Sequence, residues 1–331
     1  MSSTLERHAV TLGETLVGEG PAVVVGRLSL RVRRGQADAH EVLRECRAAE
    51  PTGGTALLVE PFSAADLPAI AELADAVVVG ASWTRDIPLV RAAAGLGLPT
   101  VVERRASGSV EEWLGLVDYC AAEGDGRVIL CEGGQVDLAL MRAARAAAGR
   151  PALVDVSADA GLSAAAVAAG ADGVVLDVLA GGGTAAHGAL KGGYAGVVAR
   201  EFGAGDGEAQ PDPSTALRAA EEAVTLVGAL LRPEAPATLP ECREAIDRLD
   251  AALATLLERR AAVAGVVQRI KPVGGFAGRD MDRERALVAR MALRAPTLGT
   301  ERLASIMNAV IEAGLLLAEE RAHQADDPDT L

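Results

Sequence analysis

Short apolar, β-branched runs alternate with Ala- and Leu-rich stretches over residues 8–200 of the chain. Each run has the length of a strand that is buried on both faces, as in a parallel sheet. The runs that we interpret as strands are 22–28, 55–60, 76–81, 99–103, 127–132, 151–156 and 173–178. The stretches between them are typical of helices. Repeated strand–helix units predict an α/β fold, either a barrel or a doubly wound sheet.

Other segments frame this region. Residues 10–20 are typical of a hairpin ahead of the first strand, and residues 180–212 are glycine-rich and loop-like. The proline-rich stretch 232–240 is interpreted as a linker. Helices are predicted at about 214–231, 240–270, 280–294 and 300–323, with a disordered tail after them. We therefore expect two domains, residues 1–232 and 233–331, because the chain is long for one core.

Composition narrows the class of protein. The chain has 331 residues and a formal charge of −14, which argues against nucleic acid or an anionic membrane surface as partner. No apolar stretch reaches about 18 residues and no signal pattern is found, so we expect a cytoplasmic protein. Four scattered cysteines without a CxxC pair indicate neither a zinc site nor a disulfide framework.

Six charged residues stand out in the helical C-terminal region: Arg243, Arg260, Lys271, Asp280, Arg283 and Glu284. Arg260 and Lys271 lie roughly 16 Å apart along one helix, close to three whole turns, so they share a face and can clamp a ligand. Arg243 lies roughly 25 Å from Arg260 and could join that site only from a second, antiparallel copy. The pattern predicts a pocket for a small, doubly anionic molecule. The plain alternative is a solvated helix face.

The segment 240–320 resembles an all-helical chorismate mutase. It carries the motif R-E-x-I-D-x-L-D…R-R…K…R-D-x-D-R-E-R in register and without a gap. The resemblance implies a three-helix domain that forms an intertwined homodimer. In that dimer Arg243 of one protomer and Arg260 of the other bind the two carboxylates of chorismate.

The same resemblance implies roles for the remaining charged residues. Lys271 donates to the ether oxygen of the breaking C–O bond, Asp280 and Glu284 hold the ring hydroxyl, and Arg283 binds substrate. Conversion of chorismate to prephenate is pericyclic, so catalysis consists of selecting a compact conformer and stabilising charge on the ether oxygen. We therefore expect no cofactor and no metal.

One departure from the family concerns the last helix. The family usually places a Gln or Glu one turn beyond a small hydroxyl residue, as a second donor to the ether oxygen, whereas this chain has Gly314 and Ala318. Glu319 points about 100° away on an ideal helix. Losing such a donor costs on the order of 3 kcal/mol. The alternatives are a weak mutase, a site completed by another residue or partner, or a mutase or lyase acting on 4-amino-4-deoxychorismate or isochorismate. A non-catalytic regulatory partner of a shikimate-pathway enzyme is a further alternative.

Residues 20–180 resemble the metal-dependent barrel synthases that make 3-deoxy-heptulosonate 7-phosphate (DAHP). The likeness is carried by GASWTRDIPLVRAAAGLGLPTVVERRASGSVEEWLGLVDYCAAEGDGRVILCEGG and supported by VDVSADAG and AAGADGVVLDV. It implies a (β/α) barrel of the TIM type. The family's second strand is missing between Arg31 and Thr55.

The chemistry that this family needs is absent from the matching positions. The strand that should end Gly-Pro-Cys-Ser ends Gly26-Arg27-Leu28-Ser29, so Leu28 replaces a metal ligand, and Ala158 replaces a histidine. The phosphate site Lys-Arg-Gly reads Glu103-Arg104-Arg105, which leaves a new ligand site as one interpretation. We expect a degenerate barrel that serves as scaffold, dimerisation surface or regulatory module.

Overall fold

The computed structural model describes residues 8–31, 38–49, 55–177, 213–232, 234–271, 273 and 275–325. The chain separates into two compact units, 1–249 (the barrel unit) and 250–331 (the helical unit). The division falls inside helix α9 (Leu239–Ile270), so the domain boundary expected at residues 232–233 stays a prediction. The predicted loop at 180–212 and the predicted disordered tail lie outside the described residues.

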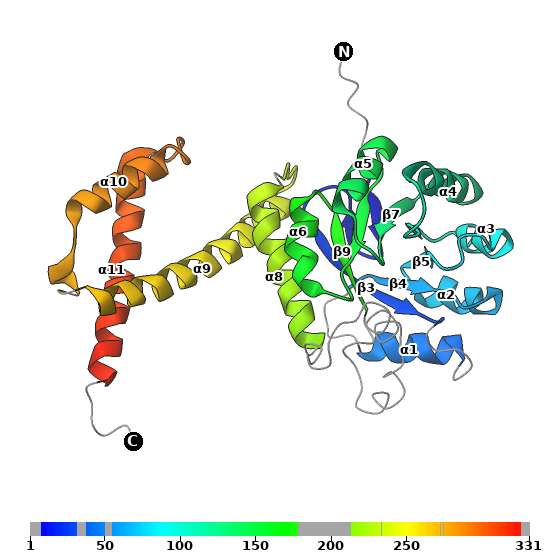
Figure 1. Cartoon of the computed structure of the whole chain (residues 1–331), viewed down its shortest axis with the longest axis horizontal. Coiled ribbons are helices and arrows are strands. Elements are labelled where there is room, and N and C mark those ends of the chain that lie inside the picture. Colours follow the sequence, from blue (N-terminus) through cyan, green and yellow to red (C-terminus); the bar gives the residue numbers. More distant parts are fainter. Residues whose placement is uncertain are drawn as a thin grey trace, which may run out of the picture. The chain divides into compact units, whose positions relative to one another are not determined.

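Seven parallel strands form a closed barrel in the barrel unit (Figure 1). They are β3 (Val23–Ser29), β4 (Leu57–Glu60), β5 (Ala76–Val79), β6 (Thr100–Glu103), β7 (Val128–Glu132), β8 (Ala152–Asp155) and β9 (Gly173–Asp177). Each strand pairs with its neighbours in sequence, and β9 also pairs with β3, which closes the ring. The barrel prediction is confirmed, and closure does not depend on a strand between residues 31 and 55.

Helices pack on the outer face of this barrel (Figure 1). They are α1 (Ala39–Ala49), η1 (Ala64–Asp66), α2 (Leu67–Leu73), α3 (Ile87–Ala94), α4 (Val110–Glu123), α5 (Leu138–Ala148), η2 (Ala160–Leu162), α6 (Ser163–Ala168) and α8 (Pro213–Leu231). Local sequence sets their ends: Ser109 and Asp137 accept backbone N–H groups as N-caps of α4 and α5. Gly149 ends α5 in the left-handed conformation that glycine allows.

Alternate residues of the strands belong to two different apolar cores. Leu28 and Val59 face the helices, whereas Val25, Leu58 and Val101 face the interior of the barrel. The predicted hairpin is present as β1 (Val10–Leu12) and β2 (Thr15–Val17), and its apolar side chains join the interior core. The same alternation continues to the carboxyl ends of the strands. It therefore predicts which polar side chains point into the barrel at that end.

The helical unit contains the C-terminal part of α9 together with η5 (Phe276–Gly278), α10 (Met281–Ala292) and α11 (Gly299–Ala325). These helices confirm the prediction from the sequence. Val288, Leu303 and Met307 form a small core between α10 and α11. Apolar side chains along α9 stay exposed, including Leu253 at 52% and Val263 at 65%. None of the helices in the described parts of the chain is long and apolar enough to cross a membrane.

Candidate functional site

A cavity of 530 Å³ lies in the helical unit, enclosed by α9, η5, α10 and α11. Its charged lining consists of Arg259, Arg260, Lys271, Arg279, Arg283, Arg290, Asp280 and Glu284. Six cations therefore face two carboxylates, in a chain whose formal charge is −14. Clustered cations in a concave site raise the local concentration of anions, so the cavity is suited to a small anionic ligand.

Five of the six predicted site residues line this cavity: Arg260, Lys271, Asp280, Arg283 and Glu284. Arg243 does not line it, because it lies near the start of α9, in the barrel unit, where it is exposed. The helical spacing that groups Arg260 with Lys271 and separates Arg243 from both is therefore present in the structure.

Arg260 and Lys271, which are expected to clamp a ligand, contact backbone carbonyls rather than carboxylates. Arg260 Nη1 donates to Val310 O at 3.4 Å, and Lys271 Nζ donates to Gly278 O at 2.8 Å. Among the described residues no carboxylate forms an ion pair with either cation. Each cation keeps further N–H groups for a ligand, since a guanidinium carries five and an ammonium three.

The two predicted acids already have partners within the protein. Asp280 caps α10, since its Oδ1 accepts from Arg283 N at 3.0 Å. Glu284 accepts from Arg279 at both carboxylate oxygens, at 2.6 Å and 3.1 Å. Binding of a ring hydroxyl by these acids stays a prediction.

Arg279 is a cavity residue that the sequence reasoning did not select. Its hydrogen bond to Glu284 is the main cause that raises its pKa above the ordinary value. Arg279 Nη2 also donates to Asn308 Oδ1 at 2.9 Å, and Nη1 lies 3.4 Å from Glu312. It therefore ties η5 and α10 to α11. The sequence did contain a signal for this residue, because Arg279 is the first residue of the R-D-x-D-R-E-R motif.

The departure on α11 has a local structural consequence. Gly314 lines the cavity, and a Cβ there would lie 3.9 Å from Arg260 Nη1. Ala318 is absent from the described lining. Glu319 packs against the loop before η5, with its Oε1 2.6 Å from the place that a Cβ on Gly275 would take. Ala318, the position of the family's second donor, thus has no side-chain group that could donate to the cavity.

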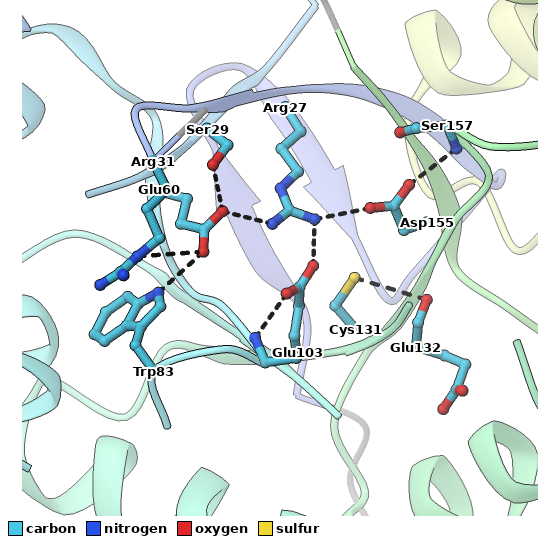
Figure 2. Close-up of polar contacts among 11 residues, drawn as sticks. Arg27, Ser29, Arg31, Glu60, Trp83, Glu103, Cys131, Glu132, Asp155 and Ser157 are labelled. Atoms are coloured by element: carbon cyan, nitrogen blue, oxygen red, sulfur yellow. Dashed lines mark hydrogen bonds and ion pairs between the residues drawn. The ribbon is translucent and has the colours of Figure 1, made fainter. Parts of the chain in front are cut away.

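A second polar cluster lies inside the barrel at the carboxyl ends of its strands (Figure 2). The guanidinium of Arg27, on β3, pairs with Glu60 on β4, Glu103 on β6 and Asp155 on β8. Its Nη2 lies 2.8 Å from Glu60 and its Nη1 2.8 Å from Asp155. The side chains of the three acids are at most 14% exposed, so one buried cation joins four strands.

Each of these carboxylates has a further donor (Figure 2). Glu60 accepts from Ser29 Oγ at 2.6 Å and from Trp83 Nε1 at 3.0 Å. Glu103 accepts from the backbone N–H of Ala81 at 2.8 Å, and Asp155 accepts from a backbone N–H in the next loop. Gly80 is required here, because a Cβ would lie 2.0 Å from Glu60 Oε1. All three acids therefore have donors within the protein, whereas Arg27 Nε is buried without a hydrogen-bond partner among the described residues.

Burial and charge act against each other in this cluster. Burial lowers the pKa of Arg27, but Glu103, Glu60 and Asp155 outweigh it and hold that pKa well above the ordinary value. Burial raises the pKa of Glu103, while Arg27 pulls it down. Burial also raises the pKa of the Cys131 thiol, helped by Glu103 and Asp155, so that thiol stays protonated. Arg27 is therefore the charge on which the ionised form of its neighbours depends.

The segment 103–105, interpreted above as a possible new ligand site, makes several contacts within the protein, and its role as a ligand site stays a prediction. Glu103 belongs to the Arg27 cluster, and Arg104 pairs with the buried Glu132 at 2.6 Å and 2.7 Å. Arg105 donates to Ser107. In the described parts of the chain no group of three or more His, Cys, Asp or Glu side chains is arranged to hold a metal ion.

Both parts of the chain are similar to known proteins. Residues 242–319 match the family model of chorismate mutase type II, so the C-terminal region contains a chorismate mutase domain, and this family supports isomerase activity. The N-terminal region resembles DAHP synthase. The chain is 27% identical over 160 residues to phospho-2-dehydro-3-deoxyheptonate aldolase of Thermotoga maritima, a match covering 39% of this chain and 47% of the relative. The chain thus spans about half the length of that curated relative.

Two solved structures of these synthases are similar to the chain. A crystal structure of the Thermotoga maritima aldolase (DAHP synthase) has a TM-score of 0.47 at 24% identity, covering 53% of this chain and 64% of that one. A truncated 3-deoxy-D-arabino-heptulosonate 7-phosphate synthase from the same organism has a TM-score of 0.43 at 24% identity, covering 53% and 81%.

Replacement of Arg27 by Met tests the barrel cluster. Removing one partner of a buried ion network costs about 3–5 kcal/mol of unfolding free energy, and we expect that loss at pH 7.5. Burial holds the pKa of Glu103 above its ordinary value even beside Arg27, and without Arg27 that pKa rises further. Stability is then kept at low pH and lost as pH rises, so the deficit relative to wild type should shrink at pH 5.

Urea unfolding followed by tryptophan fluorescence measures this, because both tryptophans, Trp83 and Trp113, lie in the barrel unit. Exposed Arg85, changed to Met, is the matched control and should leave the midpoint in place. A deficit of the same size at pH 5 and pH 7.5 would contradict a role for Arg27 as counter-charge.

Proposed function

We propose that this protein is a chorismate mutase that converts chorismate to prephenate. The observation that carries the proposal is the cavity, in which five residues of the family motif meet with an excess of cations. In this rearrangement the ether C–O bond breaks while a new C–C bond forms within the same molecule. No atom, proton or electron is exchanged, so the catalytic need is for shape and for cations beside the ether oxygen.

The proposed roles follow from position in the cavity. Arg260 and Arg243 of a second protomer bind the two substrate carboxylates, since guanidinium groups match carboxylates in geometry and charge, and Arg283 also binds substrate. Lys271, anchored at Gly278 O, donates to the ether oxygen. Arg279 holds the carboxylate of Glu284 at the wall of the cavity, where it can accept from a ring hydroxyl.

A homodimer is part of the proposal, with Arg243 supplied in trans. Arg243 cannot reach the cavity of its own chain along a straight helix, roughly 25 Å away. Ile246, Leu249, Leu253 and Leu256 of α9 are each about half exposed, between 47% and 55%. A contiguous apolar surface of this kind is typical of an interface, and a second α9 packed on it in the antiparallel sense would carry Arg243 to the partner's cavity.

We further propose that the barrel is catalytically inactive as a DAHP synthase. The support is Arg27, whose guanidinium lies among the three carboxylates at the carboxyl ends of the strands and pairs with each of them. The barrel would then act as a scaffold or regulatory module, with a shikimate-pathway enzyme as a possible partner. A cytoplasmic location is also proposed, on the basis that the four cysteines are free thiols.

One alternative substrate class has specific support. Asp280 and Glu284 are engaged as a helix cap and as the partner of Arg279, so the group that meets the ring hydroxyl is not fixed by them. A mutase or lyase acting on 4-amino-4-deoxychorismate or isochorismate would meet a different group where a chorismate mutase meets the ring hydroxyl.

Steady-state rates on these three substrates test the proposal. We expect the full chain to prefer chorismate. Arg260→Ala should lower kcat/KM by about 100-fold or more, because it removes a charged partner of a substrate carboxylate. Arg285→Ala is the control, since Arg285 lies on α10 but is exposed and outside the described lining. A wild-type chain that leaves chorismate unchanged would refute the proposal.

The dimer makes a separate prediction. Mixing inactive Arg243→Ala and Arg260→Ala chains should restore about a quarter of the wild-type rate, because half of the dimers are mixed and each mixed dimer has one complete site. Mixing Arg260→Ala with Lys271→Ala should restore nothing, since both residues belong to the same chain's part of the site. Equal recovery in the two mixtures, or none in the first despite formation of mixed dimers, would contradict the exchange of Arg243.

The barrel is tested with the substrates of a DAHP synthase. The full chain, given phosphoenolpyruvate, the sugar phosphate that such synthases condense with it, and Mn²⁺, should release no phosphate above background. The same preparation must turn over chorismate, which controls for folding of the chain. Phosphate release that requires Mn²⁺ would show that the barrel is active.

A further inference from the structure

Gln268 is the one uncharged polar side chain among the described residues that line the cavity. It lies on α9 one turn before Lys271, so both side chains project from the same face of the helix. The surrounding cations are suited to carboxylates. An amide donates hydrogen bonds without adding charge, and is suited to a neutral oxygen of the same ligand.

Two contacts hold Gln268 and Lys271 in place against the same short loop. Gln268 Oε1 accepts from Gly275 N at 2.9 Å, just before η5, and Lys271 Nζ donates to Gly278 O at 2.8 Å, at its end. Both glycines also line the cavity. The acceptor end of the Gln268 amide is therefore used, and its Nε2 hydrogens have no protein partner among the described residues. Lys271 likewise keeps two N–H groups.

We propose that Gln268 is a catalytic residue that donates from Nε2 to the same ether oxygen as Lys271. This inference rests on the proposed mutase function. An ether oxygen has two lone pairs, so it can accept from two donors one helical turn apart. Both hydrogen bonds strengthen as negative charge grows on that oxygen, which is the form of stabilisation that raises kcat. Gln268 would thus supply from α9 the donor that Ala318 does not supply from α11.

A purely structural role, in which Gln268 only fixes the loop through Gly275, is the competing explanation. Two variants separate the roles. Gln268→Glu keeps an acceptor for Gly275 N but replaces the amide donor by a carboxyl, which donates only when protonated. Gln268→Met removes acceptor and donor together, with little change in length and no added charge.

We expect kcat on chorismate to fall about 100-fold in both variants at pH 7.5, as for loss of one donor at a developing anion. Only Gln268→Glu should regain kcat, relative to wild type, as the pH is lowered to 5. A carboxylate that merely repelled the substrate would raise KM and leave kcat near the wild-type value. Gln135→Glu, the same change at an exposed position of the barrel unit, is the control.

The inference is overturned if Gln268→Glu keeps the wild-type kcat at pH 7.5 while Gln268→Met loses it, because that result assigns Gln268 to the loop alone. If the wild-type chain converts chorismate, this outcome does not contradict the proposed function. A wild-type chain without mutase activity would overturn both.

Discussion

The Arg27 guanidinium is the interaction on which the barrel unit depends, since it joins β3 to β4, β6 and β8 at the end where barrel enzymes place their chemistry. Three buried carboxylates would repel one another without it. Each of these carboxylates is paired with the guanidinium, so the cluster is held together by contacts within the protein. The cavity in the helical unit differs, because six cations and two acids line it and its charge is suited to an anion.

This contrast connects the fold to the proposed function. A barrel whose mouth is filled by its own side chains can position other parts of a protein without acting on a substrate. The helical unit has a cavity lined by an excess of cations and exposed apolar residues along α9, features suited to an anionic ligand and to an interface. In the proposed dimer, a second copy of the chain covers the exposed apolar residues of α9 and also supplies Arg243. Catalysis would then require the dimer.

The sequence predicted all seven barrel strands, because strands buried on both faces are continuous apolar runs that are easily recognised. It also grouped five cavity residues correctly, since ungapped spacing on helices fixes which side chains share a face. Arg279 and Gln268 were missed although the motif and the helical spacing contain them, because their contacts with α11 and with the loop before η5 are visible only in the folded chain. Arg27 was missed because its partners lie 33, 76 and 128 residues away, although strand alternation places it inside the barrel.

We propose that the cavity, completed by Arg243 of a second copy of the chain, rearranges chorismate without a metal ion or a second reactant. Identifying the product tests it most directly: the full chain is incubated with chorismate and a metal chelator, and the products are separated by chromatography. We expect prephenate as the single product. The chelator should leave the rate of its formation unchanged, and Arg260→Ala should abolish that rate. Unchanged chorismate, or release of pyruvate as expected of a lyase, would contradict it.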